Sequence, residues 1–257
     1  MKSKSHIFRK KWGQNFLTDS NLLDRIVRTV EPQENDNILE IGPGDGSLTE
    51  LIFPKVEQMV VVEIDPLLIK HLSIRSDLNG LKIIHGDILL QEIEDLPINN
   101  PVRIIGNIPY NITSPIIFWL IDHLDSWDRA YLMVQKEVAQ RLTGKIGTKD
   151  YSRVTVMTRL FFDIKICFSI SPNVFIPRPK VQSAFISIEK RSDFNKNDVN
   201  IKKFSQVVRM AFNQRRKMLR NSLSTLNIDL DVCKVDFKRR PEQLTVSEFI
   251  DISNNII

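Results

Sequence analysis

The sequence predicts an α/β fold in which a parallel sheet and its crossover helices precede a small helical domain. Five short apolar runs rich in β-branched residues alternate with helical stretches, as in parallel strands joined by crossover helices. The linking helices are clearest at Leu67–Leu72 and Pro115–Leu124, where apolar residues recur on one face. The predicted strands are Ile38–Ile41, Met59–Ile64, Leu81–His85, Val102–Ile105 and Ala130–Val134.

The sequence after residue 153 predicts where the first domain ends and the second begins. Two further apolar runs, Ile164–Ile170 and Ala184–Ile188, predict a strand pair with a proline-rich connection. The polar segment Ser192–Asn200 has no periodicity and predicts a domain boundary. We therefore expect a basic amino-terminal segment (1–20), an α/β domain (21–191) and a helical carboxyl-terminal domain (192–257).

Composition narrows the class of protein. The 257 residues are 42% hydrophobic, which is ordinary for a globular core, and the net charge of +5 weakly favours a polyanionic partner. Cys167 and Cys233 lack CxxC spacing and the four histidines are scattered, so neither a disulfide framework nor a metal site is expected. No apolar run reaches membrane-spanning length. A soluble, cytoplasmic monomer without a membrane partner is the expectation.

Acidic residues and glycines at strand ends indicate a nucleotide-like cofactor. Gly42, Gly44 and Gly46 follow the first predicted strand with GxGxG spacing, which differs from the GxGxxG of dinucleotide enzymes and disfavours NAD. Glu63 ends the second strand, where a carboxylate can accept from both ribose hydroxyls of an adenosine; Asp65 is the weaker candidate. Asp87 follows the third strand and can accept from an adenine amine.

The tetrapeptide Asn107-Ile108-Pro109-Tyr110 follows the fourth strand and suits a planar, amino-bearing base. An adenine amine is a poor nucleophile because its lone pair is delocalised into the ring. Acceptance by the Asn107 side-chain oxygen and a backbone carbonyl at Ile108 or Pro109 would free that lone pair, while Tyr110 stacks on the base. The alternative interpretation of the tetrapeptide is purely structural: the end of a strand followed by a proline turn. Four strand ends in this order predict a Rossmann-like methyltransferase that uses S-adenosylmethionine.

Longer motifs resemble the KsgA-type ribosomal RNA adenine dimethyltransferases, a class I methyltransferase family, over nearly the whole chain. They are Gly13–Leu17, the glycine loop, Asn107–Tyr110, Phe175–Val181 and Ala211–Lys217. The resemblance implies a cofactor-binding set of Asn15, Leu17, Gly42, Gly44, Glu63, Asp87, Ile88 and Asn107. It also implies catalysis by Asn107, Pro109, Tyr110 and Phe175, with Tyr110 and Phe175 stacking on an extruded adenosine; a loop-plugging aromatic is the alternative for Phe175.

The resemblance also implies the reaction: two methyl groups are transferred to each of two adjacent adenosines in a hairpin near the 3′ end of 16S ribosomal RNA, within the immature small subunit. Ile108 stands where leucine is commoner, and Arg178 where proline is frequent. Neither departure affects the expected chemistry. Arg178 is either a phosphate contact or a solvated surface residue.

Five cations and no acid between Arg209 and Arg220 predict a basic amphipathic helix that tracks RNA phosphates. The predicted RNA-binding residues are Arg209, Arg215, Arg216, Lys217 and Arg220. A solvated helix face is the alternative. Competing functions are a macrolide-resistance type methyltransferase acting on large-subunit RNA, a non-catalytic RNA-binding assembly factor, and a dehydrogenase.

Overall fold

The computed structural model describes residues 15–194 and 198–257. The chain forms two compact units: unit 1 comprises residues 1–136 and 165–189, and unit 2 comprises residues 137–164 and 190–257. The predicted sequence motif Gly13–Leu17 therefore lies partly outside the described residues, as do Lys2–Lys11 of the basic amino-terminal segment and part of the predicted boundary at 192–200.

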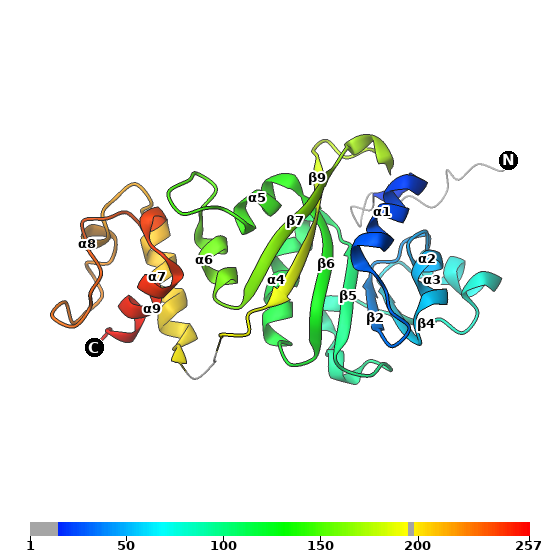
Figure 1. The fold of residues 1–257 in the computed structure, drawn as a ribbon, viewed down its shortest axis with the longest axis horizontal. Coiled ribbons are helices and arrows are strands. Elements are labelled where there is room, and N and C mark those ends of the chain that lie inside the picture. The colour runs from blue at the N-terminus through cyan, green and yellow to red at the C-terminus, as the bar shows by residue number, and fades with distance from the viewer. Residues whose placement is uncertain (1–14, 195–197) are drawn as a thin grey trace. The chain divides into compact units, whose positions relative to one another are not determined.

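Unit 1 is built on a seven-stranded sheet with the order β4-β3-β2-β5-β6-β9-β7 (Figure 1). Strands β4 to β6 are parallel, and β9 runs antiparallel to β6. The five predicted parallel strands and the later strand pair are confirmed. The strands are β2 (Asn37–Ile41), β3 (Gln58–Glu63), β4 (Lys82–His85), β5 (Val102–Asn107), β6 (Trp127–Gln135), β7 (Phe162–Ile170) and β9 (Ser183–Lys190).

The order of the strands leaves a crevice beside β2. Leu39 of β2 lies opposite Val60 of β3 on one side and Ile104 of β5 on the other. The chain moves outward from β2 through β3 to β4 and then returns to the far side of β2 as β5. Connections that follow β2 and β5 therefore leave in opposite directions, which opens the sheet for a ligand at the carboxyl ends of these strands.

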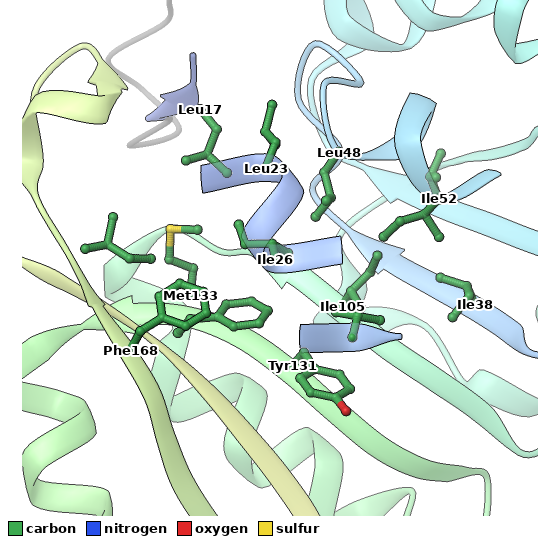
Figure 2. Close-up of a cluster of buried hydrophobic side chains, with 14 of the residues drawn as sticks. Leu17, Leu23, Ile26, Ile38, Leu48, Ile52, Ile105, Tyr131, Met133 and Phe168 are labelled. Atoms are coloured by element: carbon green, nitrogen blue, oxygen red, sulfur yellow. The ribbon is translucent and has the colours of Figure 1, made fainter. Parts of the chain in front are cut away.

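The described residues of unit 1 form the α-helices α1 (Ser20–Val30), α2 (Thr49–Ile52), α3 (Pro66–Ser73) and α4 (Thr113–Asp122). Helices α3 and α4 confirm the two predicted crossover helices. Helix α1 begins where the Asp19 carboxylate accepts from the Leu22 backbone N–H at 2.8 Å. Its apolar stripe is buried in the main core, and Figure 2 shows Leu23 and Ile26 in the same cluster as Met133 and Phe168.

A separate two-stranded ribbon joins two distant parts of unit 1. Strand β1 (Phe16–Leu17) pairs antiparallel with β8 (Phe175–Ile176), with Phe16 opposite Ile176 and Leu17 opposite Phe175. The backbone N–H of Thr18 extends the ladder by donating to the Val174 carbonyl at 3.1 Å. The segment before α1 is thereby held by the proline-rich connection between β7 and β9.

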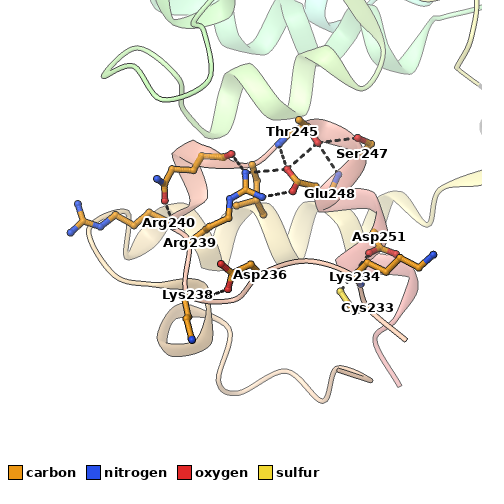
Figure 3. Close-up of polar contacts among 12 residues, drawn as sticks. Cys233, Lys234, Asp236, Lys238, Arg239, Arg240, Thr245, Ser247, Glu248 and Asp251 are labelled. Atoms are coloured by element: carbon orange, nitrogen blue, oxygen red, sulfur yellow. Dashed lines mark hydrogen bonds and ion pairs between the residues drawn. The ribbon is translucent and has the colours of Figure 1, made fainter. Parts of the chain in front are cut away.

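Unit 2 contains α5 (Lys136–Leu142), which starts at the last residue of unit 1, with α6 (Arg153–Arg159), α7 (Ile201–Asn213), α8 (Leu219–Ser222) and α9 (Val246–Asn254). The buried hydroxyl of Tyr151 donates to the Leu244 carbonyl at 2.7 Å. Arg239 pairs with Glu248 of α9 (Figure 3). In the described parts of the chain, no helix is both long and apolar enough to cross a membrane.

The predicted domain boundary after residue 191 leaves one segment of unit 2, residues 137–164, in the α/β domain. Residues 137–164 were assigned to the α/β domain, yet they pack with the carboxyl-terminal helices. The Tyr151 bond to Leu244 is one reason, and contacts between α6 and α7 are another. Local patterns along the chain do not report such long-range packing, so the boundary at Ser192 captured only part of the second unit.

The prediction of one basic helix through Arg220 is wrong. Helix α7 ends at Asn213, and a turn separates it from α8. The backbone N–H groups of Leu219 and Arg220 donate to the carbonyls of Arg239 and Phe237, at 2.9 and 3.0 Å, instead of to residues four positions earlier. These tertiary bonds fix the start of α8, while the Lys217 N–H donates to the Gln214 carbonyl at 2.8 Å and closes the turn after α7.

Arg215 has a structural role in the turn after α7. Its guanidinium donates to the carbonyls of Lys149 at 2.7 Å and Thr148 at 2.9 Å. We expect Arg215→Ala to lower the stability of unit 2 by about 1 to 2 kcal/mol, because two charge-assisted bonds at a partly exposed site are lost. Urea-induced unfolding measures this change.

The neighbouring Arg216 provides the matched control because its side chain is exposed. Arg216→Ala should shift stability by less than about 0.5 kcal/mol. Equal effects of the two substitutions would contradict the structural role of Arg215.

Candidate functional site

A cavity of 340 Å³ lies at the carboxyl ends of the parallel strands in unit 1. Its walls come from β1, from the loop after β2, from the ends of β3 and β5, and from the segments after β4 and β5. All eight predicted cofactor-binding residues line it: Asn15, Leu17, Gly42, Gly44, Glu63, Asp87, Ile88 and Asn107. The strand order thus brings together residues spread over 93 positions, from 15 to 107.

The loop after β2 requires glycine at its turning points. Gly42 and Gly44 have φ values of 67° and 63°, in the left-handed region that disfavours residues with a Cβ atom. The Gly42 backbone N–H donates to the Val62 carbonyl at 2.9 Å. At Gly44 a Cβ atom would lie 3.1 Å from the Phe16 ring, so the ring of β1 packs directly on this loop.

Glu63 is held by backbone donors at the end of β3. One carboxylate oxygen accepts from the N–H groups of Ile64 and Asp65, each at 3.0 Å, and the other from Gly44 at 3.3 Å. The residue is buried, and this desolvation raises the pKa of its carboxyl above the ordinary value. Its carboxylate lines the cavity, whereas Asp65 accepts from Leu67 N–H and caps α3.

Asp87 and Ile88 begin the segment after β4. The Asp87 carboxylate accepts from the Leu89 N–H at 3.0 Å, so it caps the short 3₁₀ helix Ile88–Leu90. This cap fixes the side chain at the cavity wall, with Gly86 beside it. The remaining carboxylate lone pairs are where a ligand amine would donate.

Glu40 is a functional candidate that sequence reasoning missed. It lies within the buried strand β2, lines the cavity, and accepts from the Thr49 hydroxyl at 2.6 Å. Burial, together with the nearby Glu63 and Asp45, raises the pKa of its carboxyl to about 7. The available signal was an acid inside an otherwise apolar strand, directly before the glycine loop.

Asn107 ends β5 with a side chain of defined orientation. Its Nδ2 group donates to the backbone carbonyl of Asn15 at 2.8 Å. Because a carboxamide presents its nitrogen and oxygen in opposite directions, this bond turns Oδ1 away from Asn15 as the acceptor for a ligand. Asn107 and Pro109 both line the cavity.

Tyr110 starts the short 3₁₀ helix after Pro109 and is anchored through its hydroxyl. Its Oη lies 2.6 Å from Oγ of Ser183, the first residue of β9. Burial raises the pKa of this phenol above its ordinary value, so it stays neutral at physiological pH. The anchored hydroxyl fixes the ring next to the Asn107 end of the cavity without placing it in the cofactor wall.

Phe175, which is predicted to stack on the target base, is buried beside the ribbon in this structure. Its side chain is only 2% exposed, belongs to the main apolar core with Leu17, and does not line the cavity. Neighbouring Ile176 and Arg178 are exposed. In this structure Phe175 packs the ribbon, which corresponds to the loop-plugging alternative considered above.

The predicted RNA-binding residues fall into two groups. Arg209, Arg216, Lys217 and Arg220 are exposed on unit 2, although the last three lie in the turn and α8 and not on one helix with Arg209. Arg215 is committed to the carbonyls of loop 148–149. Arg240 is also exposed, and Figure 3 shows its side chain extending away from Glu248.

One group of described residues has the spacing of metal ligands. Potential ligand atoms of Glu92, Glu94 and His123 lie within 4.8 Å of one another, and His123 Nε2 is 2.8 Å from Glu92 Oε2. None of the three lines the cavity. The expectation that the protein uses no metal stays a prediction.

Comparison with known proteins identifies the family. The model of the ribosomal RNA adenine dimethylase family matches residues 5–257. The chain belongs to this family. Membership confirms the predicted class of enzyme, a ribosomal RNA adenine dimethyltransferase, and the resemblance noted from the motifs.

Curated relatives share the whole length of the chain. It is 36% identical over 249 residues to "Ribosomal RNA small subunit methyltransferase A" of Coxiella burnetii, with 96% of each chain covered. It is 37% identical to the protein of that name from Xanthomonas euvesicatoria, with 96% of this chain and 95% of the relative covered.

Two solved structures confirm the Rossmann-like methyltransferase fold. A dimethyladenosine transferase from Plasmodium falciparum has a TM-score of 0.78 and 26% identity, covering 92% of this chain and 95% of that one. The 23S rRNA methyltransferase ErmE has a TM-score of 0.71 and 28% identity, covering 94% and 99%. Enzymes for both ribosomal subunits therefore resemble this chain.

The raised pKa of Glu40 makes stability depend on pH. Since the folded pKa of about 7 exceeds the ordinary 4.5, the folded state binds this proton more tightly. The stabilisation is complete below pH 4.5 and is lost as pH rises through 7, by up to about 3 kcal/mol. Thermal unfolding of the ligand-free protein between pH 5 and about 8 measures this loss.

Glu40→Gln should flatten the pH dependence because the side chain can no longer ionise. Glu57→Gln is the control, since Glu57 is exposed. A wild-type stability that does not fall over this range, or an unchanged slope in Glu40→Gln, would show that Glu40 stays ionised.

Proposed function

We propose that this chain dimethylates the exocyclic 6-amino groups of two adjacent adenosines in a hairpin near the 3′ end of 16S ribosomal RNA. The observation that carries the proposal is the oriented Asn107 amide, which ends β5 beside a cavity suited to a nucleoside cofactor. The small-subunit names of the curated relatives support this choice of RNA.

The cavity residues fit S-adenosylmethionine, which supplies an activated, positively charged methyl group when bound. Glu63 would accept from the ribose hydroxyls and Asp87 from the adenine amine, while the glycine loop would allow close approach of the backbone. Glu40 and Asp45 add negative charge at the wall beside Glu63. A cationic ligand fits this cluster of carboxyls, since it offsets their mutual repulsion and their desolvation.

The target adenosine is held by acceptors and not by a general base. Asn107 Oδ1 and a backbone carbonyl at Ile108 or Pro109 accept from the amine, which shifts its lone pair out of conjugation. Tyr110 stacks on the extruded base while Ser183 holds its hydroxyl. The ring face attracts the amine as it becomes positive, while the N–C bond forms and the S–C bond of the methyl donor breaks. The proton of the methylated amine then passes to solvent.

Unit 2 supplies phosphate contacts through exposed Arg209, Arg216, Lys217 and Arg220, with Arg240 as an addition. Phosphate contacts give affinity without sequence choice, so specificity depends on RNA shape and on the extruded base. Arg178, exposed in unit 1, is a further candidate for a phosphate contact. The immature small subunit is the proposed partner, and the enzyme acts in the cytoplasm as a monomer with a role in subunit biogenesis.

Large-subunit RNA is the second candidate substrate because ErmE shares the fold over nearly the whole chain. Incubation of unmethylated small subunits and of free 23S RNA with labelled S-adenosylmethionine, followed by mapping of the modified nucleotides, separates the two. Label on two adjacent adenosines of 16S RNA is expected. Label confined to 23S RNA would replace the proposal with the large-subunit function.

Asn107→Ala tests amine activation. We expect a loss of about 10²- to 10³-fold in kcat, the scale for removing one preorganised polar group from a transition state, with RNA binding retained. Single-turnover methylation and filter binding measure the two quantities. Asn99→Ala is the control, because Asn99 is exposed and lies outside the cavity wall.

Near-normal transfer by Asn107→Ala would refute the role of Asn107. A wild-type protein that binds RNA without methylating it would support the assembly-factor alternative.

Removal of exposed cations on unit 2 tests the RNA surface. Each of Arg216→Gln and Lys217→Gln should weaken binding for all RNA sequences and reduce the slope of log K against log salt by about 0.7 to 0.9. The control is Lys55→Gln, an exposed cation in unit 1. An equal reduction in slope for Lys55→Gln would contradict a specific role of Arg216 and Lys217 in RNA binding.

A further inference from the structure

Arg75, two residues after the end of α3, binds the glycine loop from outside the cavity wall. Its Nη1 group donates to the backbone carbonyl of Asp45 at 2.8 Å. Asp45 and Gly44 line the cavity, whereas Arg75 does not. The guanidinium therefore acts on the candidate cofactor site through the backbone of the loop.

Both polar groups of the peptide unit between Asp45 and Gly46 are bonded. The Asp45 carbonyl accepts from Arg75, and the Gly46 N–H, which points the opposite way in a trans peptide, donates to the Pro43 carbonyl at 3.0 Å. Rotation of this unit would break both bonds. Gly44 before it and Gly46 within it have φ values of 63° and 83°, and glycine permits such a rotation at little steric cost. The Arg75 bond therefore opposes a rotation that the loop sequence itself allows.

Close packing accompanies this bond. A Cβ atom at Gly46 would lie 2.9 Å from Arg75 Nη1 and 2.7 Å from Cδ2 of Leu72, in the last turn of α3. The Arg75 side chain is only 19% exposed. Arg75 and Leu72 thus support the loop by direct contact.

Two carboxylates hold the guanidinium in place. Its Nε donates to Asp77 Oδ1 at 3.1 Å, and its Nη2 pairs with both Asp77 and Glu50. Glu50 belongs to α2, and its backbone N–H donates to the Gly46 carbonyl at 3.0 Å. A planar guanidinium can serve two carboxylates and a carbonyl at once, because its five donors point in fixed directions. Arg75 therefore links the loop to α2 and to the segment after α3.

We propose that Arg75 is a positioning residue for the methyl donor: it holds the peptide unit between Asp45 and Gly46 in the orientation in which the glycine loop accepts S-adenosylmethionine. Without this bond the loop adopts other orientations, and the cofactor binds only the competent fraction. Methyl transfer from the bound cofactor is unchanged, because Asn107 and Tyr110 have their own partners. The inference rests on the proposed cofactor site.

The alternative is that Arg75 only neutralises Glu50 and Asp77, as a surface ion pair of small energetic effect. Three variants separate the two roles. Arg75→Met removes the donors and keeps the apolar stem. Asp77→Asn removes one negative charge and keeps the Arg75 donor to Asp45. The double variant removes both charges, so it restores the net charge but not the bond to the loop.

The first measurement is amide hydrogen exchange of the ligand-free protein, followed by mass spectrometry on peptides that span residues 42–49. Arg75→Met and the double variant should speed exchange at Gly46 about tenfold, the lower end of the scale for a hydrogen bond to a charged group. Asp77→Asn should change it by less than about twofold. Unchanged exchange in Arg75→Met would refute the proposal.

Arg103 provides the matched control. Its side chain is 15% exposed, its Nη1 donates to the Val30 carbonyl at 3.0 Å, and the same group pairs with Asp36 at 2.9 Å. It belongs to β5 in unit 1 but lies outside the cavity wall. Arg103→Met should therefore destabilise unit 1 without weakening cofactor binding. A loss of affinity as large as in Arg75→Met would reduce the effect to general destabilisation and overturn the proposal.

The second measurement is calorimetric binding of S-adenosylmethionine and of S-adenosylhomocysteine, which lacks the transferred methyl group and its positive charge. Arg75→Met and the double variant should raise both dissociation constants about tenfold, as expected if the loop is competent in about one molecule in ten. If Arg75 acted by charge alone, its removal would favour the cationic ligand over the other, and the double variant would restore affinity. Either result would overturn the proposal.

The third measurement is steady-state methylation of unmethylated small subunits at varied cofactor concentration. Arg75→Met should raise KM for S-adenosylmethionine about tenfold while kcat stays within about twofold, because only the competent fraction of the loop changes. A lower kcat at saturating cofactor with unchanged KM would contradict a role confined to cofactor binding.

If Arg75→Met does not fold, Arg75→Lys serves in all three measurements. Its single ammonium group pairs with Glu50 and Asp77 and leaves the Asp45 carbonyl without its donor, so the same losses are expected at about half the size. Normal exchange and affinity in Arg75→Lys would refute the proposal.

Hydrogen exchange needs neither cofactor nor RNA. A wild-type protein that fails to bind S-adenosylmethionine would refute the proposed function, while exchange at residues 42–49 still decides whether Arg75 holds the loop. The two failures are therefore distinguishable.

Discussion

Parallel pairing of β2 with both β3 and β5 is the constraint on which the site depends. Together with the parallel pairing of β4 with β3, it puts the carboxyl ends of four strands at one edge of the sheet, and the reversal of strand order beside β2 keeps that edge open. Gly42, Glu63, Asp87 and Asn107 belong to four different strand ends yet line one cavity. A shift of one residue in any register would turn the terminal side chain to the opposite face of the sheet.

Electrostatics of the cavity favour a positively charged ligand over an empty site. Burial raises the pKa values of Glu40 and Glu63, which means that folding disfavours their charged forms. When burial removes these two carboxylates from water, they lose favourable interactions with the solvent. A bound cation would replace those interactions. The stability of the free protein and its affinity for a cationic cofactor are thus opposed at Glu40: the charge that destabilises the empty fold is the charge that binds the ligand.

The sequence alone predicted those parts of the fold and of the cavity that depend on local residue patterns. Alternating apolar runs predicted the parallel strands, and glycines and acids at their ends predicted the residues of the cavity. It did not predict helix ends and unit boundaries that depend on packing between residues far apart in the sequence. Helix propensity around Arg215 and Leu219 is high, but α7 ends at Asn213, and backbone bonds to Arg239 and Phe237 hold Leu219 and Arg220 at the start of a separate helix. Similarly, nothing local to residues 137–164 indicates that Tyr151 packs with the distant Leu244.

Phe175 illustrates a related limit, because a motif records that a residue is needed but not by which contact. The same phenylalanine, two residues before Pro177, is compatible with a base-stacking wall or with a packing role inside the core, and in this structure it is buried in the core that contains Leu17. The distinction matters for catalysis without a general base. When an amine is activated only by acceptors, the reaction depends on their orientation to within a few tenths of an ångström. The Asn107 amide has a single protein bond described at its nitrogen, to the carbonyl of Asn15, directly before the short ribbon of β1 and β8. Under the proposed mechanism, the position of that carbonyl is therefore as much a requirement of the chemistry as the amide itself.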